Sequence, residues 1–166
     1  MPEAITLERA RRDKEEGKSP STQAGEFVRE EMDHIRQGKH GARNTKQAIA
    51  IGLSKARRAG VKLGAPKAGR ASGRTRKQAQ RDLAKGRHRS RTVSKRRSQA
   101  TEGALKREPH SAASRSALSK QAKQAAKRRS SEARSQAARK AARTKGPVER
   151  KRAAQKAATT RQRRAA

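Results

Sequence analysis

The 166-residue sequence contains no cysteine, tryptophan or tyrosine, and Phe27 is its single phenylalanine. The absence of cysteine excludes a disulfide scaffold, a zinc site built from thiolates and catalysis by a thiol. Large apolar residues are also scarce, because leucine, isoleucine, valine and phenylalanine together number 15. A globular domain usually needs a share of these residues above about 20%. We therefore expect that most of the chain cannot bury enough apolar surface to offset the entropy lost on folding.

Long hydrophobic runs are missing too. The longest charge-free run, Gln47 to Ser54, is far shorter than the roughly 20 apolar residues that a membrane span needs. Nine of the 14 acidic residues lie within the first 33 positions, which argues against a secretory signal and a transit peptide. These features predict a protein that stays in the cytoplasm and does not bind membranes.

Positive charge is abundant and unevenly placed. The chain has 47 lysine and arginine residues against 14 aspartate and glutamate residues, a net charge of +33. Residues 1–60 carry a net charge of +4, whereas residues 61–166 carry +29. Ten of the 15 large apolar residues lie within the first 63 positions. This distribution predicts a frayed helix and linker over 1–21, a helical hairpin over 22–63 and a cationic low-complexity tail over 64–166.

The first helix is expected to be short. Thr6 can cap its start, and Gly17 would lie just past its end. Its apolar face would consist of Ile5, Leu7 and Ala10, which is too thin to hold the helix firmly.

The hairpin is predicted from two amphipathic patterns. From about Thr22 to Gln37, apolar residues recur at helical spacing. A second helix is expected from Lys46 to Ala59, with Asn44 or Thr45 as its cap and Gly60 just past its end. A loop of about six residues would allow the two helices to pair.

One residue of the second hairpin helix does not fit the predicted packing face. Ile49, Leu53 and Ala56 form the main apolar stripe, whereas Ile51 points the other way. This second apolar position leaves open a homodimer that forms through the hairpin.

Alanine, arginine, lysine and glutamine, which favour helices, are frequent in the tail. Pro147 is well placed to begin a helix that ends near Arg164. Such helices would be polar on every side, and like charges at helical spacing repel each other. We therefore expect an all-α but largely disordered chain, with a short N-terminal hairpin and a long tail that has helix propensity and no core.

The sequence contains no recognisable motif for catalysis or metal binding. His34 and His40 are six positions apart, which is not the spacing of a known zinc motif, so both are predicted to be solvated. Glu30 and Glu31 are neighbours on a helix, without a cleft that would prepare them for acid–base catalysis. We expect no enzyme, no metal and no cofactor.

The tail has the charge of a counterion for a polyanion. Duplex DNA carries one negative charge per about 1.7 Å, so the tail could neutralise about 29 phosphates. It has no aromatic residues on which unpaired bases could stack, which favours duplex DNA over single-stranded RNA. The residues predicted to bind nucleic acid are basic and lie on the hairpin or in clusters of the tail: Arg43, Lys46, Lys55, Arg57, Arg58, Lys95, Arg96, Arg97, Lys127, Arg128, Arg129, Arg139, Lys140, Arg150, Lys151 and Arg152.

Two segments carry a resemblance to known proteins. They are Phe27 to Met32 and Gly38 to Val61. The specific part of the second is the run Lys46 to Gly60, which reads KQAIAIGLSKARRAG. They are similar to a family of small basic bacterial proteins known as a domain of unknown function, over about residues 25–65. The family has no established activity, so the resemblance implies a bacterial source and little more. In composition, the tail resembles the tails of linker histones and of bacterial histone-like proteins.

Together these features predict a non-enzymatic, histone-like protein of the nucleoid. It would bind duplex DNA without base preference through its tail, and coat, bridge or condense it. An RNA-binding or ribosome-associated protein is one alternative. A hairpin that docks on a protein partner, with the tail as a nucleic-acid anchor, is another.

Overall fold

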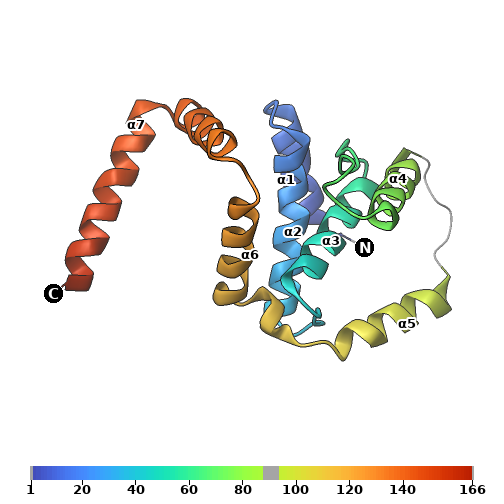
Figure 1. Cartoon of the computed structure of the whole chain (residues 1–166). Helices are drawn as coiled ribbons and strands as arrows, with labels where there is room; N and C mark the ends of the chain where they lie inside the picture. The colour runs from blue at the N-terminus through green and yellow to red at the C-terminus, as the bar shows by residue number, and fades with distance from the viewer. Residues whose placement is uncertain (1, 88–93, 166) are drawn as a thin grey trace. The chain divides into compact units, whose positions relative to one another are not determined.

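A computed structural model describes residues 2–87 and 94–165 (Figure 1). Within these residues the chain forms seven α-helices and one 3₁₀-helix. The elements are α1 (Ala4–Glu15), α2 (Pro20–Arg36), α3 (Thr45–Arg58), α4 (Gly73–Arg87), α5 (Lys95–Lys106), η1 (His110–Ala113), α6 (Arg115–Lys127) and α7 (Ser131–Ala165). The chain divides into two compact units, one ending at Gln121 and the other beginning at Ala122.

Helix α1 packs on α2 through a face that shares only Ala10 with the one expected. Its buried residues are Thr6, Ala10 and Asp13, whereas Ile5 and Leu7 are exposed. Thr6 lies inside the helix and is not its cap. Small side chains at helical spacing allow the two helices to approach closely.

The two helices expected for the hairpin are present as α2 and α3, which lie side by side (Figure 1). Asn44 caps α3, because its side-chain oxygen accepts a hydrogen bond from the Gln47 N–H at 2.9 Å. Gly38 and Gly60 follow the two helices with positive φ angles of 75° and 93°, where a side chain would be strained. The cap of α3 and the glycines that end both helices were therefore predictable, whereas α2 begins at Pro20, two residues before the expected start.

Two apolar clusters hold the first unit together. Alanine is the most frequent of the buried residues in both, so helices approach each other over small side chains. One cluster joins α1, α2, α3 and the segment that follows α3: Ala10, Ala24, Phe27, Ala56 and Val61, with Leu53 and Leu63 packed against them. The other joins α2, α3, η1 and the start of α6: Met32, Ile35, Ala42, Ala48, Ala112 and Ala113, with Val28, Ile49 and Leu118 packed against them.

The expectation of a largely disordered chain with no core beyond the hairpin is wrong. Helix α4 packs on α3, and Ala79 and Asp82 of α4 are buried. Ala112 and Ala113 of η1 belong to the core of the hairpin itself. A count of large apolar residues missed these contacts, because alanine and paired polar groups fill much of this core.

Hydrogen bonds to the backbone fix η1 and its neighbours on the hairpin. The Thr45 hydroxyl donates to the Ala112 carbonyl oxygen at 2.7 Å, and Arg36 Nε donates to the Ala113 carbonyl oxygen at 3.2 Å. The backbone N–H of Gly41 donates to the Leu105 carbonyl oxygen at 2.9 Å. These bonds satisfy buried polar groups, so residues 105–113 dock specifically although they contain few large apolar residues.

The second unit is helical as well, contrary to the predicted disorder. Helix α7 has a kink at Gly146, whose φ is 68° and ψ is 172°, and Pro147 follows it. The prediction that Pro147 begins a helix ending near Arg164 is confirmed. The high helix propensity of alanine, arginine, lysine and glutamine accounts for helices in which no described side chain is buried.

None of the helices in the described ranges is long and apolar enough to span a membrane.

Candidate nucleic-acid interface and a buried polar cluster

Most of the basic residues predicted to bind nucleic acid are exposed in the structure. They lie on α3 or the loop before it, on α5, at the end of α6 and on α7. Their side chains are free to reach a phosphate backbone without unfolding any element. The exposed members are Arg43, Lys46, Arg58, Lys95, Arg96, Arg97, Lys127, Arg128, Arg129, Arg139, Lys140, Arg150, Lys151 and Arg152.

Arg57 lies inside the first unit, where it holds the segment that follows α3. Only 7% of the residue is exposed. Its guanidinium donates from Nε to the Leu63 carbonyl oxygen at 3.1 Å and from Nη2 to the Gly64 carbonyl oxygen at 3.3 Å. Burial lowers the pKa of Arg57, and the nearby charge of Asp82 opposes this effect. The Arg57 side chain therefore stabilises the fold, although its position among other basic residues had suggested that it binds nucleic acid.

Helix α4 presents a row of basic residues that was not predicted from the sequence. Arg74, Lys77, Arg81 and Lys85 are exposed, and their spacing of three, four and four places them in one sector about 80° wide. The first three line a shallow hollow on the surface of this helix. The opposite side of α4 packs on α3 through Ala79. The helical spacing of these basic residues, on the side of the helix opposite the small residue Ala79, was the signal in the sequence that could have revealed the row.

The second unit, residues 122–166, contains 16 lysine and arginine residues and two glutamates, a net charge of +14. None of its side chains that the structure describes is buried. Among them, the one ion pair joins Arg152 Nη1 to Glu149 Oε1 at 3.1 Å, and both side chains are largely exposed. The charge of this unit is therefore almost uncompensated within the unit.

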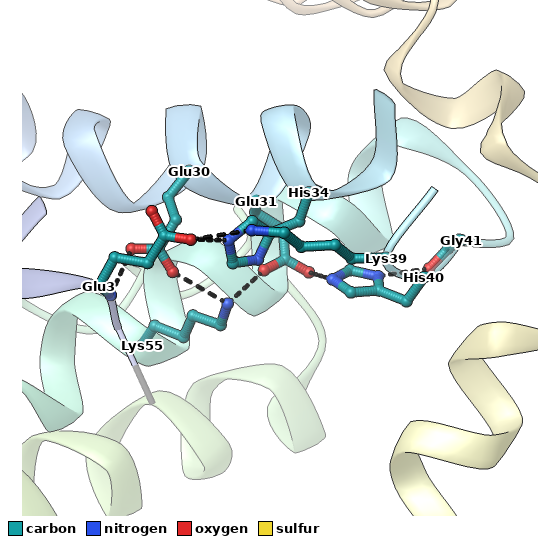
Figure 2. Close-up of polar contacts among 8 residues, drawn as sticks. All are labelled: Glu3, Glu30, Glu31, His34, Lys39, His40, Gly41 and Lys55. Carbon is teal, nitrogen blue, oxygen red and sulfur yellow. Dashed lines mark hydrogen bonds and ion pairs between the residues drawn. The ribbon is translucent and has the colours of Figure 1, made fainter. Parts of the chain in front are cut away.

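A second group of polar residues lies between α2, the loop that follows it and α3 (Figure 2). Glu31 is its centre, and no part of the Glu31 side chain is exposed. Lys55 Nζ lies 2.7 Å from Glu31 Oε2 and 3.3 Å from Glu30 Oε1. Lys55, one of the residues predicted to bind nucleic acid, thus balances two buried carboxylates. Such pairs are costly to break, because the remaining charge would be buried alone.

His34 and His40, which we expected to be solvated, both face this group. The exposed fractions of their side chains are 13% and 15%. Their rings meet edge to face, with centroids 6.0 Å apart. His40 Nε2 lies 3.4 Å from Glu31 Oε1, while His40 Nδ1 lies 3.0 Å from the Gly41 carbonyl oxygen. Because a carbonyl oxygen only accepts, Nδ1 carries a proton and donates to it.

Glu3 closes the group from the start of α1. Its Oε1 accepts hydrogen bonds from His34 Nε2 at 2.8 Å and from Lys39 Nζ at 3.0 Å. These two bonds lower the pKa of Glu3 to about 2, and the bond from His34 has a larger effect than the bond from Lys39. The backbone N–H of Glu3 also donates to Glu30 Oε2 at 3.1 Å. Sequence spacing could not predict this group, because its members come from four separate segments: the residue before α1, α2, the loop after α2, and α3.

Comparison with known proteins shows that part of the chain is similar to one family. Residues 14–68, which include α2 and α3, match a family of unknown function, DUF6496. This agrees with the expected resemblance to a domain of unknown function. No curated protein and no solved structure matches the chain. The predicted histone-like character of the chain beyond residue 63 thus has no support among these comparisons.

Proposed function

We propose that this protein binds duplex DNA independently of base sequence, through exposed lysine and arginine side chains that contact backbone phosphates. The observation that carries the proposal is the second unit, in which a net charge of +14 accompanies no buried side chain among those described. So many positive charges close together repel one another and destabilise the folded state. A bound polyanion removes this repulsion. The proposed function is non-enzymatic.

The length and charge of α7 indicate how one helix would engage a duplex. From Pro147 to Ala165 the helix has 19 residues, which corresponds to about 28 Å. Seven basic residues and one acidic residue lie on this stretch. A duplex of the same length carries about 17 phosphates. The helix would therefore neutralise part of the backbone and leave phosphates free for the other basic helices or for a second molecule.

Double-stranded nucleic acid is favoured over single strands. Proteins that bind single strands stack bases on exposed aromatic side chains. The one phenylalanine of the chain, Phe27, is 1% exposed and packs in the core. Contacts to phosphates alone carry no base sequence, so we expect binding without base preference. On this proposal the protein is a small basic bacterial protein of the nucleoid.

A binding experiment with the full chain tests the proposal. Fluorescence anisotropy would measure Kd at one salt concentration for three duplexes of unrelated sequence, a single strand and a structured RNA of equal length. We expect the three duplexes to bind with Kd values within about threefold of one another, because phosphates supply the affinity. The single strand and the RNA should bind more weakly. A clear preference for the RNA, or for one duplex sequence, would contradict the proposal.

A further inference from the structure

The group around Glu31 has a feature that salt bridges alone leave unexplained. Neither oxygen of the buried Glu31 carboxylate has a hydrogen-bond partner within the part of the chain that the structure describes. Lys55 Nζ at 2.7 Å and His40 Nε2 at 3.4 Å lie close to it, but neither contact has hydrogen-bond geometry. A fully buried carboxylate normally accepts several hydrogen bonds or coordinates a cation.

The two histidines are held so that each keeps one nitrogen for a further partner. The Gly41 carbonyl oxygen fixes the proton of His40 on Nδ1, which leaves Nε2 directed at Glu31. The Glu3 carboxylate fixes a proton of His34 on Nε2, which leaves Nδ1 with a lone pair in the neutral ring. A carbonyl or carboxylate that holds the second nitrogen of a histidine is the usual support of a metal-ligating imidazole.

We infer that Glu31, His34 and His40 form a binding site for a divalent transition-metal ion of the zinc type. One ligand atom from each residue lies within 4.8 Å of the other two. An ion at the centre of such a triangle is at most about 2.8 Å from each atom, so shifts of less than about 1 Å bring all three to bonding distances near 2.1 Å. Two imidazoles and one carboxylate suit zinc and its neighbours in the first transition series, whereas calcium and magnesium prefer oxygen ligands alone.

The charge of the group favours a cation. With both histidines neutral, the three carboxylates Glu3, Glu30 and Glu31 exceed the two ammonium groups of Lys39 and Lys55 by one negative charge. A neutral His40 would also direct the lone pair of Nε2 at the Glu31 oxygen across 3.4 Å. A proton on Nε2 or a metal ion between the two atoms removes this repulsion. The ion would additionally connect the third residue, His34.

The proposed ion would tie α2 to the loop that follows it, in addition to the contacts described above. Glu31 and His34 belong to α2, whereas His40 belongs to the loop whose Gly41 N–H binds the Leu105 carbonyl oxygen. A bond from the ion to His40 would therefore strengthen the attachment of residues 105–113 to the hairpin. This role is structural and does not depend on the proposed binding of DNA.

Titration of the full chain with Zn²⁺, in competition with a chromophoric chelator, tests the inference. We expect one equivalent to bind. His34→Gln and His40→Gln should each weaken the affinity at least about 100-fold, because each removes a ligand and glutamine does not replace an imidazole. His110 is exposed and lies outside the group, so His110→Gln is the matched control and should bind as the parent chain does.

Two further measurements keep the result clear. Co²⁺ in place of Zn²⁺ should give visible absorption bands that the His40→Gln variant lacks. Zn²⁺ should also raise the Tm of the parent chain but not that of His40→Gln, because the ion binds the folded state. The inference is overturned if no equivalent of Zn²⁺ binds, if the His34 and His40 variants bind as tightly as the parent, or if His110→Gln loses as much affinity as they do.

Discussion

Gly52 of α3 lies directly against the backbone of α2 at Val28. A Cβ atom at position 52 would lie 2.7 Å from Val28 Cα and 3.0 Å from the Phe27 carbonyl oxygen. Backbone atoms cannot rotate away as a side chain can, so any side chain here would push the two helices apart. The glycine therefore sets the distance between the helices of the hairpin.

Gly52→Ala should destabilise the protein by about 1–3 kcal/mol, because the overlap exceeds the gain in helix propensity. Urea denaturation followed by circular dichroism would measure the free energy of unfolding. Gly103 in α5 is the control, since a Cβ there would meet only the end of the Arg107 side chain at 4.0 Å. Gly103→Ala should raise stability by about 0.5–1 kcal/mol. Equal effects of the two changes would refute the close packing at Gly52.

The ion pairs of Lys55 lead to a second prediction. Lys55→Met keeps the aliphatic stem but leaves Glu31 without its 2.7 Å ammonium partner, so we expect a loss of about 3 kcal/mol in the free energy of unfolding. The double variant Lys55→Met with Glu31→Leu should regain the part of this loss that comes from Glu31, whereas Glu30 still lacks its 3.3 Å partner. Arg58→Gln, at an exposed position three residues along α3, should change stability by less than about 0.5 kcal/mol.

Denaturation of the three variants side by side would decide whether Lys55 has this structural task. A Lys55→Met chain as stable as the parent would show that the buried carboxylates do not need it. A double variant that recovers none of the loss would show that the pair with Glu31 is not what makes Lys55 stabilising.

The basic row on α4 is expected to contact phosphates. Replacement of Arg74, Lys77 and Arg81 by glutamine, which keeps helix propensity, should reduce the magnitude of the log–log salt slope for duplex DNA by about 2.7. The free energy of unfolding should stay within about 0.5 kcal/mol of the parent value, because all three side chains are exposed.

A triple variant on α1 separates contact from net charge. Arg11, Arg12 and Lys14 are exposed on a helix that also carries acidic residues. Their replacement by glutamine removes the same total charge. It should leave the salt slope nearly unchanged. Equal losses for the two triple variants would mean that the row on α4 is not a contact surface.

The sequence predicted the C-terminal end of α2 and both ends of α3 well because caps and glycines act locally. Asn44 and Gly60 determine where α3 begins and ends without help from distant residues. The packing of α3 was less predictable, since Ala48 and Gly52 are buried whereas Ile49 and Leu53 are only partly so. A contact made by a small side chain depends on how near the partner backbone lies, and a hydrophobic pattern does not record that distance.

The polar group around Glu31 was beyond sequence reasoning for a similar reason. Glu31 and Lys55 are 24 positions apart, and only the pairing of α2 with α3 makes them neighbours. His40 lies in a loop whose course depends on the docking of residues 105–113. Neither histidine belongs to a motif of fixed spacing, so burial and proximity had to come from the fold.

The salt dependence of DNA binding tests the central claim most directly. If the full chain engages ten or more phosphates, the slope of log K against log salt concentration is about −9 or steeper for duplex DNA. A sixfold variant replaces two clusters of exposed basic residues by glutamine: Lys127, Arg128, Arg129, Arg150, Lys151 and Arg152. Its slope should be shallower by about 5. A parent slope shallower than about −2, or a sixfold variant with the parent slope, would contradict the account.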